Sequence, residues 1–524
     1  MPGLRSPTHG ELDAMHTAYR SPAITLASQP SADLQTDLLV IPVFTDDDFS
    51  DERTLDAASG GEVSHARARG ELTGKLYEGL ATATSSANWK TPRALLVGAG
   101  GRRDFTADHL RRIAIVGGLH ARSRRLTRVT VVDRAGTSVP AERAAQAIAE
   151  GLCLANYDGA SYRTGGQPPS WIEEAQARIS SDGPAVREAL ERGRVLGDMS
   201  NEARTLANLP GNDLTPRVFA ERAQAIAKDA GLGVEVLDEQ KIASLKMGML
   251  LGVARGSQEP PRLVVLRHDP PNAVKGVVLG LVGKGITFDT GGISIKPADN
   301  MDKMKDDMSG GAAVICAMSA IARLKVPVRV VAIVPMTENM PGGKAFKPGD
   351  VLISAAGKTV EIINTDAEGR LILGDGLWYA RELGATHLVD IATLTGACVV
   401  ALGKTTTGLF GSPTGWVDVV RRASARAGDR SWPMPVFDDY KDQLKSEIAD
   451  FTNTGGRPAG ATTAALFLKE FVADLPWVHM DIAGTAWAEE AKPYQPKGAT
   501  GVGVRTLVEL ALDAATWGAQ NLKD

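Results

Sequence analysis

Paired carboxylates at turns between apolar segments are the residues of this sequence most suited to chemistry. Asp366 and Glu368 lie in the octapeptide Asn-Thr-Asp-Ala-Glu-Gly-Arg-Leu at 364–371, which also contains Arg370. An apolar, β-rich run at 359–363 precedes it, and apolar residues with helical spacing follow it. The cluster is therefore expected at a strand-to-helix turn, where open α/β sheets bind ligands. Taken alone, an acidic turn is more often a helix cap than a ligand site.

A second charged turn follows another apolar run, and it raises the chance of a shared site. It contains Lys284, Asp289 and Lys296, and Asp307 comes shortly after it, before a helix-like apolar segment. Desolvating several like charges is costly unless cations neutralise them. The basic residues of these turns could do so as a structural ion network. Two divalent metals bridged by carboxylates could do so as well, and they would activate water for hydrolysis. The residues alone leave both interpretations open.

Other site types find less support. The phosphate-loop pattern fails because Val278 stands where its first glycine is required and Gly285 follows the lysine. None of the eight histidines lies in an HExxH pattern, which excludes that zinc site. The glycine-rich turn after 94–97 has Arg103 at the third glycine position of a dinucleotide fingerprint, which favours a structural turn. His479 lies in an apolar strand, where a hydrogen-bonded core role is expected.

The composition is that of a globular α/β protein of more than one domain. The 524 residues are 43% hydrophobic and include 56 glycines, and a chain this long forms two or three domains of about 150 residues each. The net charge of −4 gives no general attraction to nucleic acid or to acidic membranes. Three widely separated cysteines indicate a reducing compartment. Without an apolar signal core or a membrane-spanning run, the sequence predicts a soluble, cytoplasmic protein.

Alternating apolar runs and helical patterns predict an α/β fold with two domains. We expect a loose N-terminal segment at 1–22 and a smaller, macro-domain-like α/β domain at 23–160. A linker and connecting helix at 161–195 would lead to a larger catalytic domain at 196–524. Nearly continuous Val, Ile and Leu in the strands of this larger domain predict a mixed central sheet covered by helices on both faces.

The octapeptide resembles the signature of the leucyl aminopeptidase (cytosol aminopeptidase) family of dinuclear metallopeptidases, in its bacterial form. The turn at 282–297 also resembles this family, and 82 residues separate Lys284 from Asp366, as the family requires. Shorter matches follow in order at 304–308, 338–341, 393–396 and 481–487. The similarity is strong from about residue 200 onward and weak over the first 160 residues. Ser-Gly-Gly at 309–311 and Gly-Asp-Gly at 374–376 depart from the usual pattern, outside the ligand positions.

The resemblance implies a site for two divalent cations, zinc or manganese. Lys284, Asp289, Asp307 and Glu368 would hold one ion. Asp289, Asp366 and Glu368 would hold the other, so that Asp289 and Glu368 bridge the pair. A hydroxide between the ions would attack the scissile carbonyl group.

Two basic residues would assist this reaction by the same resemblance. Lys296 would polarise the scissile carbonyl, and Arg370 would hold a bicarbonate that acts as general base. Arg370 suits an anion because it lies at the expected start of a helix, where free N–H groups and the helix dipole favour negative charge. Lys284 could bind a metal only as the neutral amine, which burial and a nearby cation would favour.

The resemblance further implies a peptidase that releases N-terminal residues, with leucine and other apolar residues preferred, and that assembles as a homohexamer. The pocket for substrate would be lined by Met304, Asn364, Thr393, Leu394 and Gly396. A different dinuclear hydrolase, such as a phosphoesterase, is the alternative enzyme. A DNA-binding regulator that uses the arginine-rich first domain is the alternative role outside catalysis, and the overall acidity argues against it.

Overall fold

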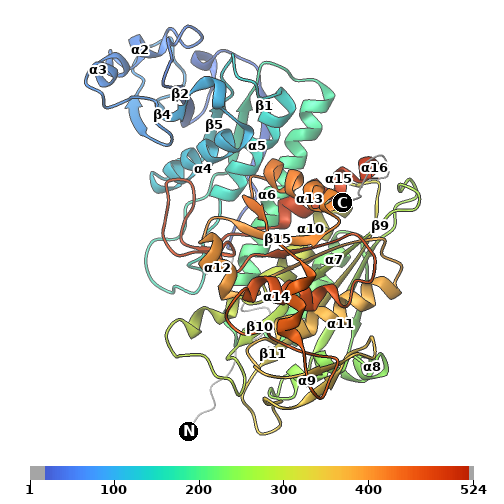
Figure 1. Cartoon of the computed structure of the whole chain (residues 1–524). Helices are drawn as coiled ribbons and strands as arrows, with labels where there is room; N and C mark the ends of the chain where they lie inside the picture. The colour runs from blue at the N-terminus through green and yellow to red at the C-terminus, as the bar shows by residue number, and fades with distance from the viewer. Residues whose placement is uncertain (1–17, 518–524) are drawn as a thin grey trace. The chain divides into compact units, whose positions relative to one another are not determined.

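The computed structural model describes residues 18–517, so most of the loose segment predicted at 1–22 lies outside the described residues. The described chain forms two compact units (Figure 1). The first contains the chain up to Asn201 together with Glu490–Lys497. The second contains Glu202–Glu489 and the chain from Gly498 onward. The division falls within the long helix α6 (Pro184–Asn208).

The first unit is built on a six-stranded sheet of the order β1-β6-β5-β2-β4-β3, in which only β3 is antiparallel to its neighbour. Its strands are β1 (Ala23–Ala27), β2 (Leu38–Phe44), β3 (Gly79–Ala83), β4 (Arg93–Gly100), β5 (Arg128–Val132) and β6 (Glu174–Arg178). β1, β2, β4 and β5 coincide with the β-like runs that the sequence shows at 23–27, 38–43, 94–97 and 129–132. β6 was not predicted: it lies within 161–195, the segment expected to be a linker and connecting helix, and it pairs with both β1 and β5.

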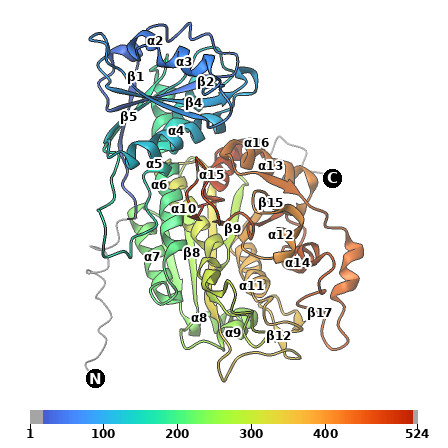
Figure 2. The same ribbon diagram turned by 90° about the vertical axis from the view of Figure 1, so that its left-hand side faces the viewer.

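Helices cover both faces of this sheet (Figure 2). They are α2 (Leu55–Ala58), α3 (Glu62–Ala68), α4 (Ala107–Ser123) and α5 (Ala141–Ala155). β2 shows how one strand serves both faces, because successive side chains of a strand point to opposite sides. Leu38 and Val40 belong to the apolar cluster with α4 and α5, whereas Leu39 and Ile41 belong to the cluster with α2 and α3.

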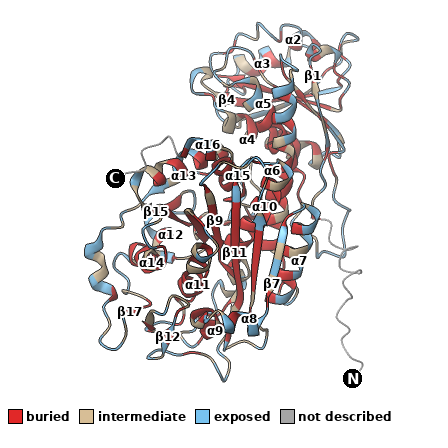
Figure 3. Cartoon of the chain, turned by 90° about the vertical axis from the view of Figure 1, so that its right-hand side faces the viewer, coloured by how far each residue is buried: buried red, intermediate tan, exposed pale blue. Residues whose placement is uncertain are grey.

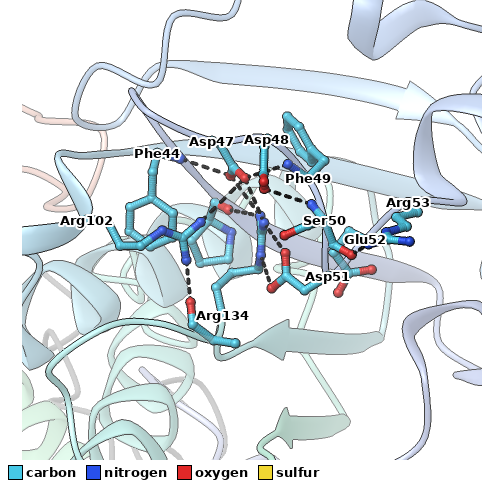
Figure 4. A network of polar contacts seen from close by, with 12 residues as sticks. Phe44, Asp47, Asp48, Phe49, Ser50, Asp51, Glu52, Arg53, Arg102 and Arg134 are labelled. Carbon is cyan, nitrogen blue, oxygen red and sulfur yellow. Dashed lines mark hydrogen bonds and ion pairs between the residues drawn. The ribbon is translucent and has the colours of Figure 1, made fainter.

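A buried ion-pair network fixes the loop that follows β2 (Figure 4). Arg134, just beyond β5, is 1% exposed. Its guanidinium donates to the carboxylate of Asp47 at 2.9 and 3.0 Å and to that of Asp51 at 2.8 Å. The third partner is the carbonyl oxygen of Pro42, at 2.8 Å. Because these acceptors surround the guanidinium, the network joins the ends of two strands and is structural in character.

The second unit contains a nine-stranded mixed sheet of the order β16-β15-β18-β14-β9-β11-β8-β7, with β10 also paired to β11. The central strands are β9 (Val278–Gly283), β10 (Gly285–Asp289), β11 (Arg329–Asn339), β14 (His387–Ala392) and β18 (Trp477–Asp481). These five run parallel, so their carboxyl ends lie at one edge. The outer strands are β7 (Gly233–Leu237), β8 (Arg262–His268), β15 (Thr407–Ser412) and β16 (Ser431–Pro433).

Helices cover both faces of this sheet as well, and its central strands are deeply buried (Figure 3). One face carries α7 (Pro216–Asp229), α10 (Ser309–Arg323), α13 (Thr414–Ala427) and α15 (Val504–Leu512). The other carries α8 (Glu239–Ser244), α9 (Gly248–Ala254), α11 (Gly369–Glu382) and α14 (Gly460–Lys469). The predicted fold class, a mixed central sheet between two helical layers beside a smaller α/β domain, is confirmed.

Smaller elements complete the second unit and hold the turns at the carboxyl edge of the sheet. They are β12 (Val351–Ile353), β13 (Thr359–Glu361), β17 (Phe451–Thr452), η3 (Met301–Asp306) and α12 (Gly396–Leu402). β13 pairs with β17 and leads into the turn before α11. Glycine allows α10 to begin directly against β14, because a Cβ on Gly310 would lie 2.1 Å from the carbonyl oxygen of Ile391. Among the described residues, no helix is both long and apolar enough to cross a membrane.

Candidate metal centre

Lys284 and Asp289 stand at the ends of two consecutive parallel strands. Lys284 follows β9 directly, and its backbone N–H donates to the carbonyl of Ile391 on β14 at 3.1 Å. Asp289 ends β10, and its Oδ1 accepts from the backbone N–H of Gly291 and from Asn339 Nδ2, both at 2.9 Å. Both side chains are buried, at 2% and 3% exposure. Strand pairing therefore places an amine and a carboxylate at the carboxyl edge of the sheet.

The octapeptide forms the predicted strand-to-helix turn between β13 and α11. Glu368 is the residue that precedes α11, and Asp366 lies two residues earlier. Thr365 ties this turn to the other charged turn, since its Oγ1 donates to the carbonyl of Gly291 at 2.6 Å. Asn339 donates to the Thr365 carbonyl at 3.0 Å as well as to Asp289, so one amide connects both turns.

Two lysines cross-link the four carboxylates. Lys284 Nζ lies 2.8 Å from Asp307 Oδ2 and 2.9 Å from Glu368 Oε1. Lys296 Nζ lies 2.9 Å from an oxygen of Asp289 and 2.5 Å from one of Asp366. Thr393 accepts a third contact from Lys284 through its carbonyl, at 3.0 Å, and its hydroxyl donates to Asp307. The structure thus brings together all the residues that the sequence proposed as metal ligands.

The pKa values of these groups are shifted by crowding in a buried space. Burial raises the pKa of Asp307 well above its ordinary value, and Lys284 only partly opposes this. Burial and the neighbouring Asp289 raise the pKa of Glu368. Burial alone would lower the pKa of Lys284, but the adjacent carboxylates outweigh it and raise that pKa. Burial also raises the pKa of Asp366, against the opposing charge of Lys296. More positive charge would stabilise this cluster.

Oxygen ligands converge on one point of the cluster. One carboxylate oxygen from each of Asp289, Asp366 and Glu368 lies within 4.8 Å of the others. Glu368 is 1% exposed, and its Oε2 has no hydrogen-bond partner among the described residues. A buried carboxylate oxygen without a donor is costly, and a cation would satisfy it. Hard oxygen donors with lysine amines nearby suit manganese, magnesium or zinc, so the residues present fit a divalent metal.

Arg370 lies in the first turn of α11, beside the cluster but without an ion pair to it. It is 6% exposed, and burial lowers its pKa to about 10. Its Nη1 donates to the carbonyl of Asn453 at 2.9 Å, while its buried Nε has no partner among the described residues. This guanidinium therefore keeps donor capacity for an anion at the start of a helix.

The five residues predicted to line the substrate pocket lie in different surroundings in the structure. Thr393 contacts the cluster, and the backbone N–H of Leu394 donates to Asp481 at 3.3 Å. Gly396 begins α12 and is exposed. Asn364 is exposed, and its side-chain oxygen accepts from the backbone N–H of Asp366 at 2.8 Å. Met304 lies in η3, which leads to Asp307; the two are joined by a backbone hydrogen bond of 3.5 Å.

Asn453 is a residue of this site that the sequence did not indicate. Its Oδ1 accepts from the backbone N–H of Ile363 and of Asn364, and its Nδ2 donates to the Asn364 carbonyl at 2.6 Å. It follows β17, whose pairing with β13 brings it to the octapeptide. Only that pairing, between segments some 90 residues apart, reveals its role.

Models of one protein family match most of the chain. The catalytic domain of the cytosol aminopeptidase family matches residues 201–508, and the N-terminal domain of the same family matches residues 40–166. The chain belongs to the cytosol aminopeptidase family. A probable cytosol aminopeptidase of Solibacter usitatus is 48% identical over 493 residues, which are 94% of this chain and 99% of that protein. One from Koribacter versatilis is 45% identical, covering 93% and 99%.

Solved structures agree with this assignment. A tomato leucine aminopeptidase variant superposes with a TM-score of 0.86 at 32% identity, covering 95% of this chain and 98% of its own. A bottromycin maturation enzyme in complex with Mn has a TM-score of 0.81 at 35% identity, covering 92% and 100%. This family member is therefore a metal-dependent aminopeptidase, a hydrolase that releases N-terminal residues from peptides. Its cofactor is a divalent metal ion.

Proposed function

We propose that the aminopeptidase binds two divalent ions, manganese or zinc, at the carboxylate cluster. Asp289 and Glu368 would bridge the ions, Asp366 would serve one of them, and Lys284 with Asp307 would serve the other. The observation that carries this proposal is the convergence of three carboxylate oxygens within 4.8 Å, together with the unpartnered Oε2 of Glu368. When bound, the ions would polarise the scissile carbonyl and lower the pKa of an attacking water.

Lys284 has a double role in this proposal. Its ammonium group pairs with Asp307 and Glu368, which raise its pKa. An ammonium has no lone pair, so Lys284 would coordinate an ion only after it loses its proton. Cation binding would then release a proton, as expected where metal ligands must be deprotonated.

Lys296 and Arg370 would act on the substrate rather than hold the metal. Lys296 is partly exposed, with 22% of its side chain accessible, and reaches Asp289 and Asp366 at the open side of the cluster. An ammonium there would stabilise negative charge on the carbonyl oxygen during attack. Arg370, with its unpartnered Nε, would hold a bicarbonate that takes up the proton of the attacking water.

Peptides with an apolar first residue are the proposed substrates, with leucine or methionine preferred. Leu394 and Met304 would supply apolar surface, and the chemistry would act only on residues whose free α-amine can reach the metal. We further propose a homohexamer, as the family resemblance implies, and a location in the cytoplasm, in keeping with the names of the curated relatives. A role in nucleic-acid binding receives little support, because several arginines of the first unit pair with acids there: Arg102, Arg111, Arg112, Arg122 and Arg128.

Metal content and substrate class test the proposal together. The purified chain, supplied with Mn²⁺ or Zn²⁺, should hydrolyse leucine p-nitroanilide and leave a phosphate monoester intact. Elemental analysis should find two ions per chain, and Asp366→Ala should lose metal and activity. Asp418→Asn, an exposed acid of the same unit, is the matched control and should change neither. An Asp366→Ala variant with full metal content and activity would refute the ligand assignment. Retarded DNA in a low-salt gel-shift titration would instead support the regulatory role.

A further inference from the structure

A second buried charge pair lies in the sheet of the catalytic unit. Asp390 and His479 occupy directly opposed positions of the parallel strands β14 and β18, and neither is exposed to solvent. His479 Nδ1 lies 2.5 Å from Asp390 Oδ1, and Trp477 donates to the other carboxylate oxygen at 2.7 Å. Both oxygens of Asp390 are thus engaged by β18. The predicted hydrogen-bonded core position of His479 is confirmed, but core packing alone does not require a charged partner.

The pair lies just below a loop proposed to contact substrate. Asp481, two residues beyond His479, points to the same face of the sheet and ends β18. Its carboxylate accepts from the backbone N–H of Leu394 at 3.3 Å and from the Thr395 hydroxyl at 2.6 Å. Leu394 and Thr395 form the loop that follows β14 and leads to α12. Asp481 is therefore the anchor of this loop.

The charges around His479 favour the protonated imidazole, whose buried Nε2 has no hydrogen-bond partner among the described residues. Asp390 from β14 and Asp481 from β18 bring two negative charges, and Arg370 from α11 brings one positive charge. Burial would lower the pKa of His479, but Asp390 and Asp481 outweigh it, so the pKa is raised. The ring of Phe410 on β15, which packs on His479, is uncharged.

We propose that His479 is a positioning residue: its ion pair with Asp390 ties β18 to β14, so that Asp481 at the end of β18 holds the loop of Leu394 and Thr395 against the first side chain of the substrate. Without this pair, Trp477 would be the side-chain partner that Asp390 keeps on β18. The ends of the two strands would then be held together less firmly, and the acceptor bonds of Asp481 to the loop would weaken. The proposal rests on the proposed substrate pocket, since it assigns the loop to the first side chain.

Substrate comparison separates this role from a purely structural one. His479→Gln should raise KM for leucine p-nitroanilide about 10-fold, the scale of a lost pocket contact, while kcat changes less. Glycine p-nitroanilide, which has no side chain to meet the loop, should be nearly unaffected. His387→Gln is the matched control, because His387 begins β14, the strand of Asp390, but packs on Trp416 and Trp517. Equal losses for both substrates, or unchanged KM values, would overturn the proposal.

A stability measurement tests the charge state without relying on activity. A histidine whose pKa is raised in the folded state stabilises the fold fully below its unfolded pKa, and this contribution is lost as pH rises through the folded pKa. The melting temperature of the wild-type chain should therefore fall relative to that of His479→Gln as pH rises above about 6.5. A constant difference across pH 6 to 10 would show that His479 does not carry the proton, even if the enzyme cleaves leucine substrates as proposed.

Discussion

Asp375 offers a stringent test of how the catalytic helix α11 is held, because it is a fully buried carboxylate without a cationic partner among its contacts. It lies in the second turn of α11, seven residues after Glu368. Its Oδ2 accepts from the backbone N–H of Met249 at 3.1 Å and of Leu250 at 3.0 Å, and its Oδ1 accepts from that of Ala355 at 2.8 Å. The side chain of Asp375 thus caps the start of α9. It also joins α9 and the loop of Ala355 to α11, the helix that carries the site.

The expected cost of Asp375→Ala follows from these three contacts. The substitution leaves three buried N–H groups without an acceptor, and each costs about 1–3 kcal/mol. Solvent and local rearrangement recover part of that cost. We therefore expect the free energy of unfolding to fall by about 3–6 kcal/mol, which is at the upper end for a single substitution. In a domain of this size, 1 kcal/mol corresponds to about 2 °C, so the melting temperature should fall by about 6–12 °C.

The pH dependence of Asp375 gives a second, independent readout. Burial raises its pKa to about 7, although three N–H donors oppose the shift. A carboxyl whose folded pKa lies above its unfolded value of about 3.9 favours folding below that value, and this contribution is lost as pH rises to about 7. The change is at most about 4 kcal/mol, at 1.36 kcal/mol for each pKa unit. The stability advantage of the wild type over Asp375→Asn, which does not titrate, should therefore shrink from pH 5 to pH 8.

Thermal and denaturant unfolding of the full chain, with activity measured at 25 °C, will check both expectations. Asp375→Ala should keep kcat for the folded fraction, because Asp375 does not contact the metal centre. Asp418→Ala, at an exposed position paired with Arg421, should unfold as the wild type does. If Asp375→Ala unfolds within 1 kcal/mol of the wild type, about the error of such measurements, the buried N–H groups do not depend on Asp375 and the argument fails.

Three further expectations concern other parts of the molecule. Arg134→Met should destabilise the first unit by about 3–5 kcal/mol, because it leaves the buried Asp47 with Arg102, at 3.5 Å, as its cationic partner; unchanged unfolding by circular dichroism would contradict this. Asn453→Ala should lower kcat/KM about 10- to 100-fold with little change in metal content, because it releases the loop beside Arg370; kinetics and elemental analysis will separate the two effects. Mn²⁺ at 100 times its Kd should stabilise the wild type by about 2.7 kcal/mol in calorimetry and should stabilise Glu368→Gln much less; equal stabilisation would argue against this ligand.

The central sheets were predictable because their strands are strongly apolar, and β6 shows where this approach fails. β9 and β14 consist almost wholly of buried residues, and the sequence shows them as continuous apolar runs. β6 reads Glu-Ala-Gln-Ala-Arg, and only Ala175 and Ala177 are buried in it. Its place between β1 and β5 comes from pairing with distant strands, which a short, polar stretch does not reveal.

The sequence brought out the acids of the candidate site because turns after apolar strands share one edge of a parallel sheet. Asp289, Asp366 and Glu368 do meet there. Spacing did not reveal that Lys284 lies among the acids, and only the family resemblance suggested a place for it there. The sequence did not indicate that the side-chain amides of Asn339 and Asn453 hold the site together, because each bonds to a backbone carbonyl or N–H of a distant turn. Such hydrogen bonds depend on tertiary pairing and leave no local pattern in the sequence.

The charges of the site explain why it needs both its lysines and its metal. Four carboxylates meet two ammonium groups, so the pairing leaves the acids in excess, and burial raises the pKa of Asp307, Asp366 and Glu368. Each lysine brings one positive charge to two acids, whereas a divalent ion between two carboxylates brings two positive charges. In the proposed site, Lys284 could then give up its proton without leaving the acids unbalanced. We therefore expect the lysines to keep the metal-free chain folded around a group of charges that is arranged for multivalent cations.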